Sequence, residues 1–250
     1  MSPRITLAVA RRVLTQLRHD HRTLALLLVM PCVVLSLLRW MYDARPQLFD
    51  GLGPPLLALI PFIVMFLVTS VTTLRERSSG TLERLLAMPM GKLDLLLGYA
   101  LAFGLMAAVQ STLAVALCLW GLGLNVEGPV PALVLVAVAD AVLGTAFGLF
   151  VSAFARTEFQ AVQFMPAVVF PQLLLCGLFL DRDQLPAGLD VFSDVLPLSY
   201  AVDAMTWVAQ GAPDGGDGVP PEVWPDLAVV AGFAVALLCL GAATLRRRTA

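Results

Sequence analysis

Residues 55–74, PLLALIPFIVMFLVTSVTTL, contain no charged side chain, whereas residues 75–89, RERSSGTLERLLAMP, carry five. A helix of roughly 20 apolar residues crosses a bilayer core about 30 Å thick. The first stretch therefore predicts a transmembrane helix. The second predicts a short charged loop at the membrane surface, because another long apolar stretch begins near Leu95.

The composition indicates that the whole chain is an integral membrane protein. Hydrophobic residues make up 59% of its 250 residues and charged residues only 14%, whereas a soluble domain has about 25% charged residues. The net charge of −2 is too small to suggest a nucleic-acid partner. The four cysteines are far apart in the sequence, so they predict free thiols and neither a disulfide framework nor a metal site.

Six apolar segments approach or exceed the length needed to cross a bilayer. We therefore predict an all-α membrane protein, with residues 1–250 forming a single transmembrane domain. The predicted spans are Thr23–Leu38, Pro55–Leu74, Leu95–Leu122, Val130–Phe154, Phe159–Leu180 and Leu227–Leu245.

Basic residues predict the orientation of these spans. Thirteen of the 16 lysine and arginine residues precede the first span, lie between the second and third or the fourth and fifth, or follow the sixth. Only Arg39, Arg45 and Arg182 fall on the opposite side. Because basic loops stay in the cytoplasm, we expect both termini to be cytoplasmic.

The charged loop over residues 75–92 predicts a short amphipathic helix at the cytoplasmic surface. Leu82, Leu85 and Leu86 lie on one face at helical spacing. Glu83 and Arg84 lie on another. The alternative is a solvated loop that only sets orientation, but orientation would need only the basic residues.

The N-terminal segment, residues 1–22, predicts a second amphipathic helix in the cytoplasmic interface. Apolar residues such as Val9, Val13 and Leu17 leave most of the arginines on another side. His19 and His21 flank an aspartate, but they lack a third ligand nearby, so no metal site is predicted.

Nucleotide-binding and catalytic motifs are absent from the sequence. A phosphate-binding loop of the form G-x-x-x-x-G-K-[ST] needs its lysine. The only lysine is Lys92, with Leu86 in place of the first glycine and Leu93 in place of Ser or Thr. The chain is therefore not expected to be an enzyme, and no catalytic residue is predicted.

A few polar residues fall within the predicted spans. Asp140, Gly144 and Gly148 share one helix face at spacings of four residues, which favours close helix packing. Asp140 could be hydrogen-bonded to a neighbouring span, through Gln110, Ser111 or Thr112, or it could line a pathway. Gln163 and Gln172 add amides beside Pro166 and Pro171, and each of these prolines can kink a helix.

Residues 181–200 are too polar to span the bilayer. Acids and prolines alternate with apolar residues here. Short re-entrant helices in the outer leaflet are one interpretation and need cover from protein or water. A plain extracellular loop is the other.

Together these features resemble the membrane subunits of type-2 ABC exporters, the family that includes the daunorubicin-resistance permeases. The resemblance rests on six spans, the basic N-terminal helix, RERSSGTLERLLAMP at 75–89 and LLLCGLFLDRDQLPAGLDVFSDVLPLSY at 173–200. Two departures from the expected pattern are Leu178, where a small residue is expected, and Thr206, where a basic or amide residue is common.

The resemblance implies a role for each of these segments. The charged loop would be the coupling helix that docks on an ATPase subunit, with the residues Glu76, Gly80, Thr81, Leu82, Glu83, Arg84, Leu85 and Leu86. The outer region would hold re-entrant helices, with Leu185, Pro186, Pro197 and Tyr200 in its signature.

The resemblance also implies the partners and the function. The chain would pair with a second membrane subunit, identical or paralogous, and with separate ATPase chains that bind ATP and Mg, while it binds no cofactor itself. It would lie in a bacterial plasma membrane and export an amphiphilic drug or lipid-like substrate. Export of a polysaccharide or other glycoconjugate, a non-transporting scaffold or immunity protein, and a membrane enzyme acting on lipid are the alternatives.

Overall fold

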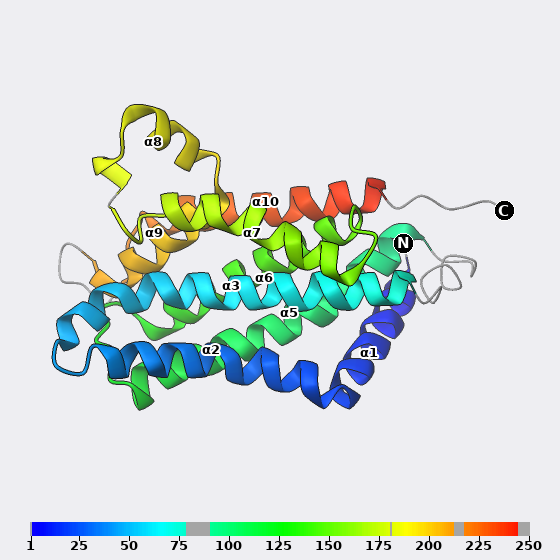
Figure 1. The fold of residues 1–250 in the computed structure, drawn as a ribbon, viewed down its shortest axis with the longest axis horizontal. Coiled ribbons are helices and arrows are strands. Elements are labelled where there is room, and N and C mark those ends of the chain that lie inside the picture. The colour runs from blue at the N-terminus through cyan, green and yellow to red at the C-terminus, as the bar shows by residue number, and fades with distance from the viewer. Residues whose placement is uncertain (1, 79–90, 181, 213–217, 245–250) are drawn as a thin grey trace.

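A computed structural model describes residues 2–78, 91–180, 182–212 and 218–244, and these residues form helices and no strands (Figure 1). The prediction of an all-α fold is confirmed. The helices are α1 (Pro3–His19), α2 (His21–Met41), α3 (Pro46–Ser78), α5 (Lys92–Ala116), the π-helical turn η1 (Leu117–Gly121), α6 (Val130–Ser152), α7 (Glu158–Leu175), the short 3₁₀ turn η2 (Arg182–Gln184), α8 (Ala187–Asp194), α9 (Pro197–Gln210) and α10 (Val223–Thr244).

Within the described ranges, five helical segments are long and apolar enough to cross a membrane. They are His21–Met41, Pro46–Glu76, Leu93–Gly121, Val130–Ser152 and Val223–Thr244. Each overlaps one of the predicted spans. The second was predicted to begin at Pro55, but α3 already begins at Pro46 and includes Pro54, Pro55 and Pro61. Neighbouring helices can satisfy the backbone groups that proline frees, so proline does not have to end a helix inside a membrane protein.

The predicted span Phe159–Leu180 corresponds to α7, which is shorter than expected. α7 ends at Leu175, and the chain turns at Gly177 with φ +89°, so the predicted end at Leu180 was wrong. α7 packs along α3 and runs from one end of the bundle towards the other (Figure 1). Because α7 runs along the bundle in this way, the start of α1 and the end of α10 lie at the same end of the bundle.

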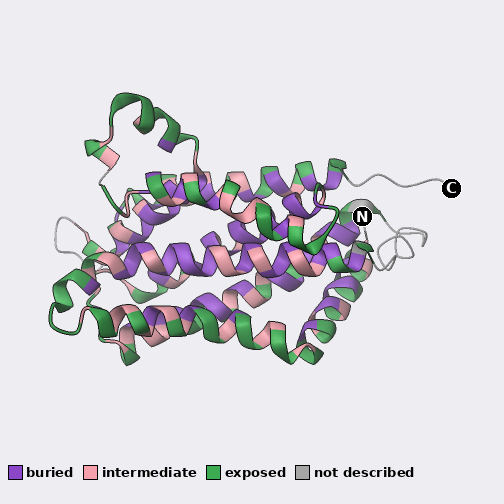
Figure 2. Ribbon diagram, viewed as in Figure 1, coloured by how far each residue is buried: buried purple, intermediate pink, exposed green. Residues whose placement is uncertain are grey.

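The tightest helix pairing in the bundle is between α3 and α6. A Cβ atom added to Gly144 would lie 2.4 Å from the carbonyl oxygen of Phe62, and one added to Gly148 would lie 2.7 Å from that of Phe66. The two glycines therefore let the α6 backbone approach α3, as the small-residue spacing predicted. Figure 2 shows this central pair mostly buried, whereas α2 exposes much of its surface.

The N-terminal helix α1 lies across the end of the bundle and packs on α5 (Figure 1). Val9, Val13 and Leu17 are buried, and a Cβ atom on Gly98 of α5 would lie 2.6 Å from the Cβ of Val9. The apolar side of this amphipathic helix is therefore covered by protein. Leu7, on another side, is 63% exposed.

Candidate functional site: a polar junction at one end of the bundle

Five helices meet at the end of the bundle where α1 lies, and they bring charged groups together there. α3 ends there, α5 and α7 begin there, and α1 joins α2 there (Figure 1). These ends flank the predicted coupling helix. Of the predicted coupling residues, Glu76 lies in α3, whereas Gly80, Thr81, Leu82, Glu83, Arg84, Leu85 and Leu86 lie outside the described residues.

Glu76 is the centre of this polar junction and is almost fully buried. Its Oε2 accepts a hydrogen bond from Arg12 Nη2 of α1 at 3.2 Å and a close hydrogen bond from the Tyr99 hydroxyl of α5. A buried carboxylate needs such partners, because its desolvation is costly. Arg12 and Tyr99 are partners of Glu76 that the sequence analysis did not name.

Arg75 joins α3 to α7 and to the joint between α1 and α2. Its Nε and Nη2 donate to the two carboxylate oxygens of Glu158 at 3.1 and 3.2 Å, a bidentate arrangement. Its Nη1 lies 3.9 Å from Asp20 Oδ2. The hydrogen bonds from Arg75 hold the pKa of the Glu158 carboxyl below its usual value.

Asp20 sits at the sharp joint between α1 and α2 and caps the second helix. Its carboxylate accepts from Thr23 N at 3.1 Å and from Thr23 Oγ1 at 2.7 Å. These hydrogen bonds, with the nearby Arg75 charge, lower the pKa of Asp20. The cap satisfies backbone donors that the first turn of a helix leaves open.

Asp94 fixes the start of α5 on the other flank of the coupling segment. Its carboxylate accepts from Gly91 N at 3.2 Å and from Ser2 N at 3.0 Å. The first contact caps α5, and the second ties the beginning of the chain to it. Both flanks of residues 79–90 are therefore anchored to α1, through Arg12 on one side and Ser2 on the other.

Asp140 and Gln110 are buried polar residues deep in the bundle. Among the described residues, neither carboxylate oxygen of Asp140 has a hydrogen-bond partner, and neither amide atom of Gln110 has one. Ser111 donates to the carbonyl oxygen of Ala137 at 3.1 Å. The expected hydrogen bond from Gln110, Ser111 or Thr112 to Asp140 is therefore not formed, because Gly144 and Gly148 bring the α6 face against the α3 backbone.

The two glutamines of α7 have different environments. Gln163 is exposed. Gln172 is buried, and it donates to the carbonyl oxygen of Val168 at 3.0 Å and accepts from Leu198 N at 3.3 Å. Gln172 therefore anchors the start of α9 to α7, whereas no such contact involves Gln163 within the part of the chain that the structure describes.

The predicted re-entrant region, residues 181–200, forms short helices at the opposite end of the bundle. Pro186 precedes α8, Pro197 begins α9, and Leu185 N donates to the carbonyl oxygen of Arg182 at 3.0 Å. α8 stands out beyond the side of α7 (Figure 1). Of the two interpretations of this region, short helices and a plain loop, the structure shows short helices.

Arg182 holds these short helices together, a role that the sequence analysis missed. Its guanidinium pairs with Asp194 at 2.5 Å and with Asp203 of α9, and it stacks over the Tyr200 ring at 5.3 Å. The Tyr200 hydroxyl donates to the carbonyl oxygen of Asp194 at 2.8 Å. We call Arg182, Asp194, Tyr200 and Asp203 the outer clasp. Burial raises the pKa of Asp203, and the hydrogen bond from Arg182 partly offsets this effect.

Comparison with known proteins gives the family. The model of the ABC-2 type transporter family matches residues 4–209, most of the chain. This chain belongs to the ABC-2 type transporter family. The match covers the polar junction, the α3–α6 pair and the outer clasp.

Individual relatives of this ABC-2 type chain are distant. It is 28% identical over 207 residues to ABC transporter G family member 20 of Dictyostelium discoideum, covering 82% of this chain and 28% of the relative. It is 27% identical over 150 residues to the probable multidrug ABC transporter permease YbhR of Escherichia coli, covering 60% of this chain and 41% of the relative. It is 28% identical over 209 residues to the inner membrane transport permease YhhJ of Escherichia coli, which covers 80% of this chain and 54% of the relative. The chain thus spans about half the length of these relatives, or less.

Proposed function

We propose that the chain is the membrane-spanning permease subunit of an ATP-driven exporter. The observation that carries this proposal is the polar junction. Glu76 links α3 to α1 and α5, and Arg75 links α3 to α7. A force applied to the segment between α3 and α5 would therefore reach four helices through buried or bidentate contacts. Family membership and the names of the relatives support the same conclusion.

ATP and Mg are bound in this proposal by a separate ATPase subunit, which docks on residues 79–90. Leu82, Leu85 and Leu86 would enter an apolar groove, and Glu83 and Arg84 would lie at its rim. A second membrane subunit would complete the pathway. Both termini would be cytoplasmic, and this agrees with the start of α1 and the end of α10 lying at the same end of the bundle (Figure 1).

The proposed cargo is an amphiphilic drug or lipid-like molecule that moves outward. The bundle presents extensive apolar surface with few amides, and the exposed faces of α2 and α5 carry residues such as Leu26, Met30, Leu101 and Leu105. Such surfaces suit molecules that partition into the bilayer.

Inside-out membrane vesicles give a direct test. Vesicles from cells that express the chain with an ATPase subunit should accumulate fluorescent amphiphiles when ATP is added. Vesicles that lack the chain, or that carry the Leu85→Asp variant, should not, because the aspartate would place an unpaired charge in the apolar docking contact. Equal uptake with wild type and Leu85→Asp would refute the coupling role. ATP-independent turnover of lipid by the purified chain would point to an enzyme instead.

A further inference from the structure

The outward face of α1 carries a row of arginines that the coupling role does not use. Arg4, Arg11 and Arg18 are seven residues apart, which is about two helical turns. All three are exposed and lie opposite the face that Val9 and Val13 bury against α5. The row therefore projects a positive field away from the protein.

The acids at this end of the bundle do not neutralise that row. In the described part of the chain, Asp20 binds Thr23, Glu76 binds Arg12, Asp94 binds Ser2 and Gly91, and Glu158 binds Arg75. No ion pair within the described ranges involves Arg4, Arg11, Arg18 or Arg22. The face is therefore suited to an anionic ligand.

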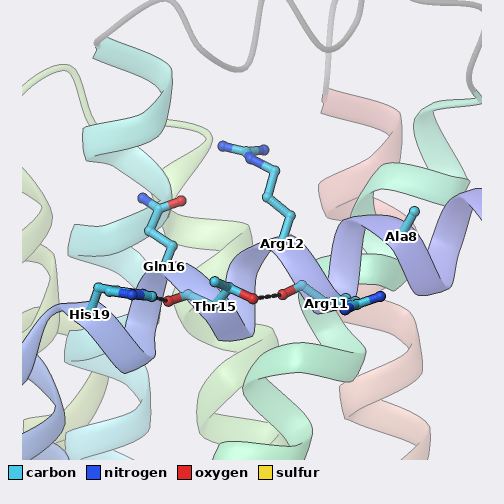
Figure 3. A pocket seen from close by; sticks show the side chains of 6 residues that line it. All are labelled: Ala8, Arg11, Arg12, Thr15, Gln16 and His19. Atoms are coloured by element: carbon cyan, nitrogen blue, oxygen red, sulfur yellow. Dashed lines mark hydrogen bonds between the residues drawn. The ribbon is translucent and has the colours of Figure 1, made fainter.

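A shallow groove of about 640 Å³ lies within this face (Figure 3). It is lined by Ala8, Arg11, Arg12, Thr15, Gln16 and His19. Arg12 and Gln16 extend from the same side of the helix, as Figure 3 shows.

The groove offers hydrogen-bond donors and lacks a carboxylate. Arg12 gives one nitrogen to Glu76, but its buried Nη1 has no acceptor among the described residues. The Thr15 hydroxyl and the His19 ring are already bonded to backbone carbonyl oxygens of α1. The Gln16 side chain is hydrogen-bonded to Glu76. The exposed Arg11 guanidinium therefore remains to bind a ligand, and the partly exposed Arg12 side chain adds positive charge beside it. Guanidinium groups match phosphate oxygens in geometry and charge.

The position of the groove relative to α2 indicates that the phosphate belongs to a lipid headgroup. The exposed apolar face of α2 begins at Leu26 and continues through Met30 and Val33. Leu26 follows Arg22 by four residues, a rise of about 6 Å along the helix. The arginines of α1 and Arg22 thus lie beside the edge of the apolar belt, the level at which lipid headgroups are found.

We propose that the groove around Arg11 and Arg12 binds the phosphate headgroup of an anionic phospholipid. Arg11 donates to the phosphate oxygens, and the positive charge of the partly exposed Arg12 side chain adds to the attraction. Arg4, Arg18 and Arg22 attract the anionic surface without touching the bound headgroup. Because Arg12 also holds Glu76, the bound lipid shares a residue with the polar junction.

The test is native mass spectrometry of the detergent-purified chain titrated with phosphatidylglycerol, and with phosphatidylcholine as the zwitterionic reference. Wild type should retain phosphatidylglycerol preferentially. Arg11→Gln should weaken that binding about tenfold, the loss expected for a charge-assisted contact. Arg4→Gln is the matched control on the same helix. It removes the same charge outside the groove, so at an ionic strength of about 0.15 M it should have a clearly smaller effect.

Three results would overturn the proposal. Equal losses in Arg11→Gln and Arg4→Gln would indicate a general surface charge without a site. Full displacement of the lipid by millimolar glycerol phosphate would indicate a soluble phosphate ligand. Unchanged phosphatidylglycerol binding in Arg11→Gln, with lost ATP-driven transport in vesicles, would assign the groove to the ATPase partner. Lipid binding is measured without ATP, so its failure leaves the transport proposal standing.

Discussion

Arg12 Nη2 and Glu76 Oε2 lie 3.2 Å apart although the two residues are separated by 64 positions in the sequence. The contact joins the surface helix α1 to the end of α3, and the Tyr99 hydroxyl adds α5. Glu76 is almost fully buried, whereas Arg12 is partly accessible. Loss of Arg12 therefore removes the cation that compensates the buried Glu76 carboxylate.

We expect Glu76→Gln to lower the stability of the detergent-solubilised chain by about 1.5–3 kcal/mol, the range for hydrogen bonds to charged groups. A double-mutant cycle with Arg12→Gln, read by thermal unfolding, should show coupling between the two sites. The neighbouring Arg11→Gln is the control. Arg11 is exposed and makes no ion pair in the described ranges, so its effect should add to that of Glu76→Gln. Coupling of equal size with Arg11 would contradict the pairing.

Asp20 should make stability depend on pH in the acid range. Its pKa is lowered in the folded chain, chiefly by the side chain of Thr23, so its contribution is present above the unfolded pKa of about 3.9 and is lost as the pH falls through the folded value. At neutral pH, Asp20→Ala should cost about 1 kcal/mol through loss of the helix cap. The melting temperatures of wild type and Asp20→Ala should converge as the pH drops below 4.

Asp20→Asn separates the cap from the charge. Asparagine caps helices about as well as aspartate, so this variant should retain most of the stability at neutral pH. If Asp20→Asn melts as early as Asp20→Ala, the ion pair with Arg75 matters more than the cap.

The spans could be predicted from the sequence because each depends on local composition. Hydropathy located the five apolar helices, and the spacing of Gly144 and Gly148 correctly indicated close packing. The exception was the helix predicted at Phe159–Leu180. Its positive-φ turn at Gly177 gives no signal in a hydropathy profile.

The polar junction could not be predicted in the same way, because its partners are distant in the sequence. Arg75 and Glu158 are separated by 83 positions, and nothing near either residue indicates the other. One signal was available: a glutamate at the end of an apolar span must find a cation or a donor. That argument predicts that Glu76 has a partner but not that the partner is Arg12.

Gly144→Ala should destabilise the chain far more than the same change at Gly232. The new Cβ would lie 2.4 Å from a backbone carbonyl of α3, and backbone yields less easily than the end of a side chain. Overpacking of this kind costs about 1–3 kcal/mol. Gly232 of α10 has nothing within 4 Å of its added Cβ, so Gly232→Ala should be nearly neutral. Equal melting temperatures for the two variants would show that the α3–α6 contact is looser than described.

Asp140→Leu should leave assembly intact and reduce transport. Because Asp140 is fully buried and its oxygens lack partners among the described residues, replacing it removes a desolvation cost and breaks no hydrogen bond. A purely structural aspartate would not need to be unpaired at this depth. Yield and melting temperature should match or exceed wild type, while ATP-driven uptake into vesicles falls. Lost assembly with normal specific transport would favour a packing role instead.

The outer clasp should control how firmly α8 is held. Arg182 pairs with Asp194 at the end of α8 and with Asp203 of α9, and it stacks on Tyr200. In Arg182→Ala these ties are lost, although Ser193 still donates to the carbonyl oxygen of Leu175 at 2.8 Å. Amide hydrogen exchange over Ala187–Asp194 should then be at least about tenfold faster, the change expected from losing roughly 1.4 kcal/mol of local stability. Asp183→Asn is the matched control, because this exposed acid lies next to Arg182 and forms no ion pair in the described ranges. Unchanged exchange in Arg182→Ala would show that Ser193 and the packing of α8 hold the helix without the arginine.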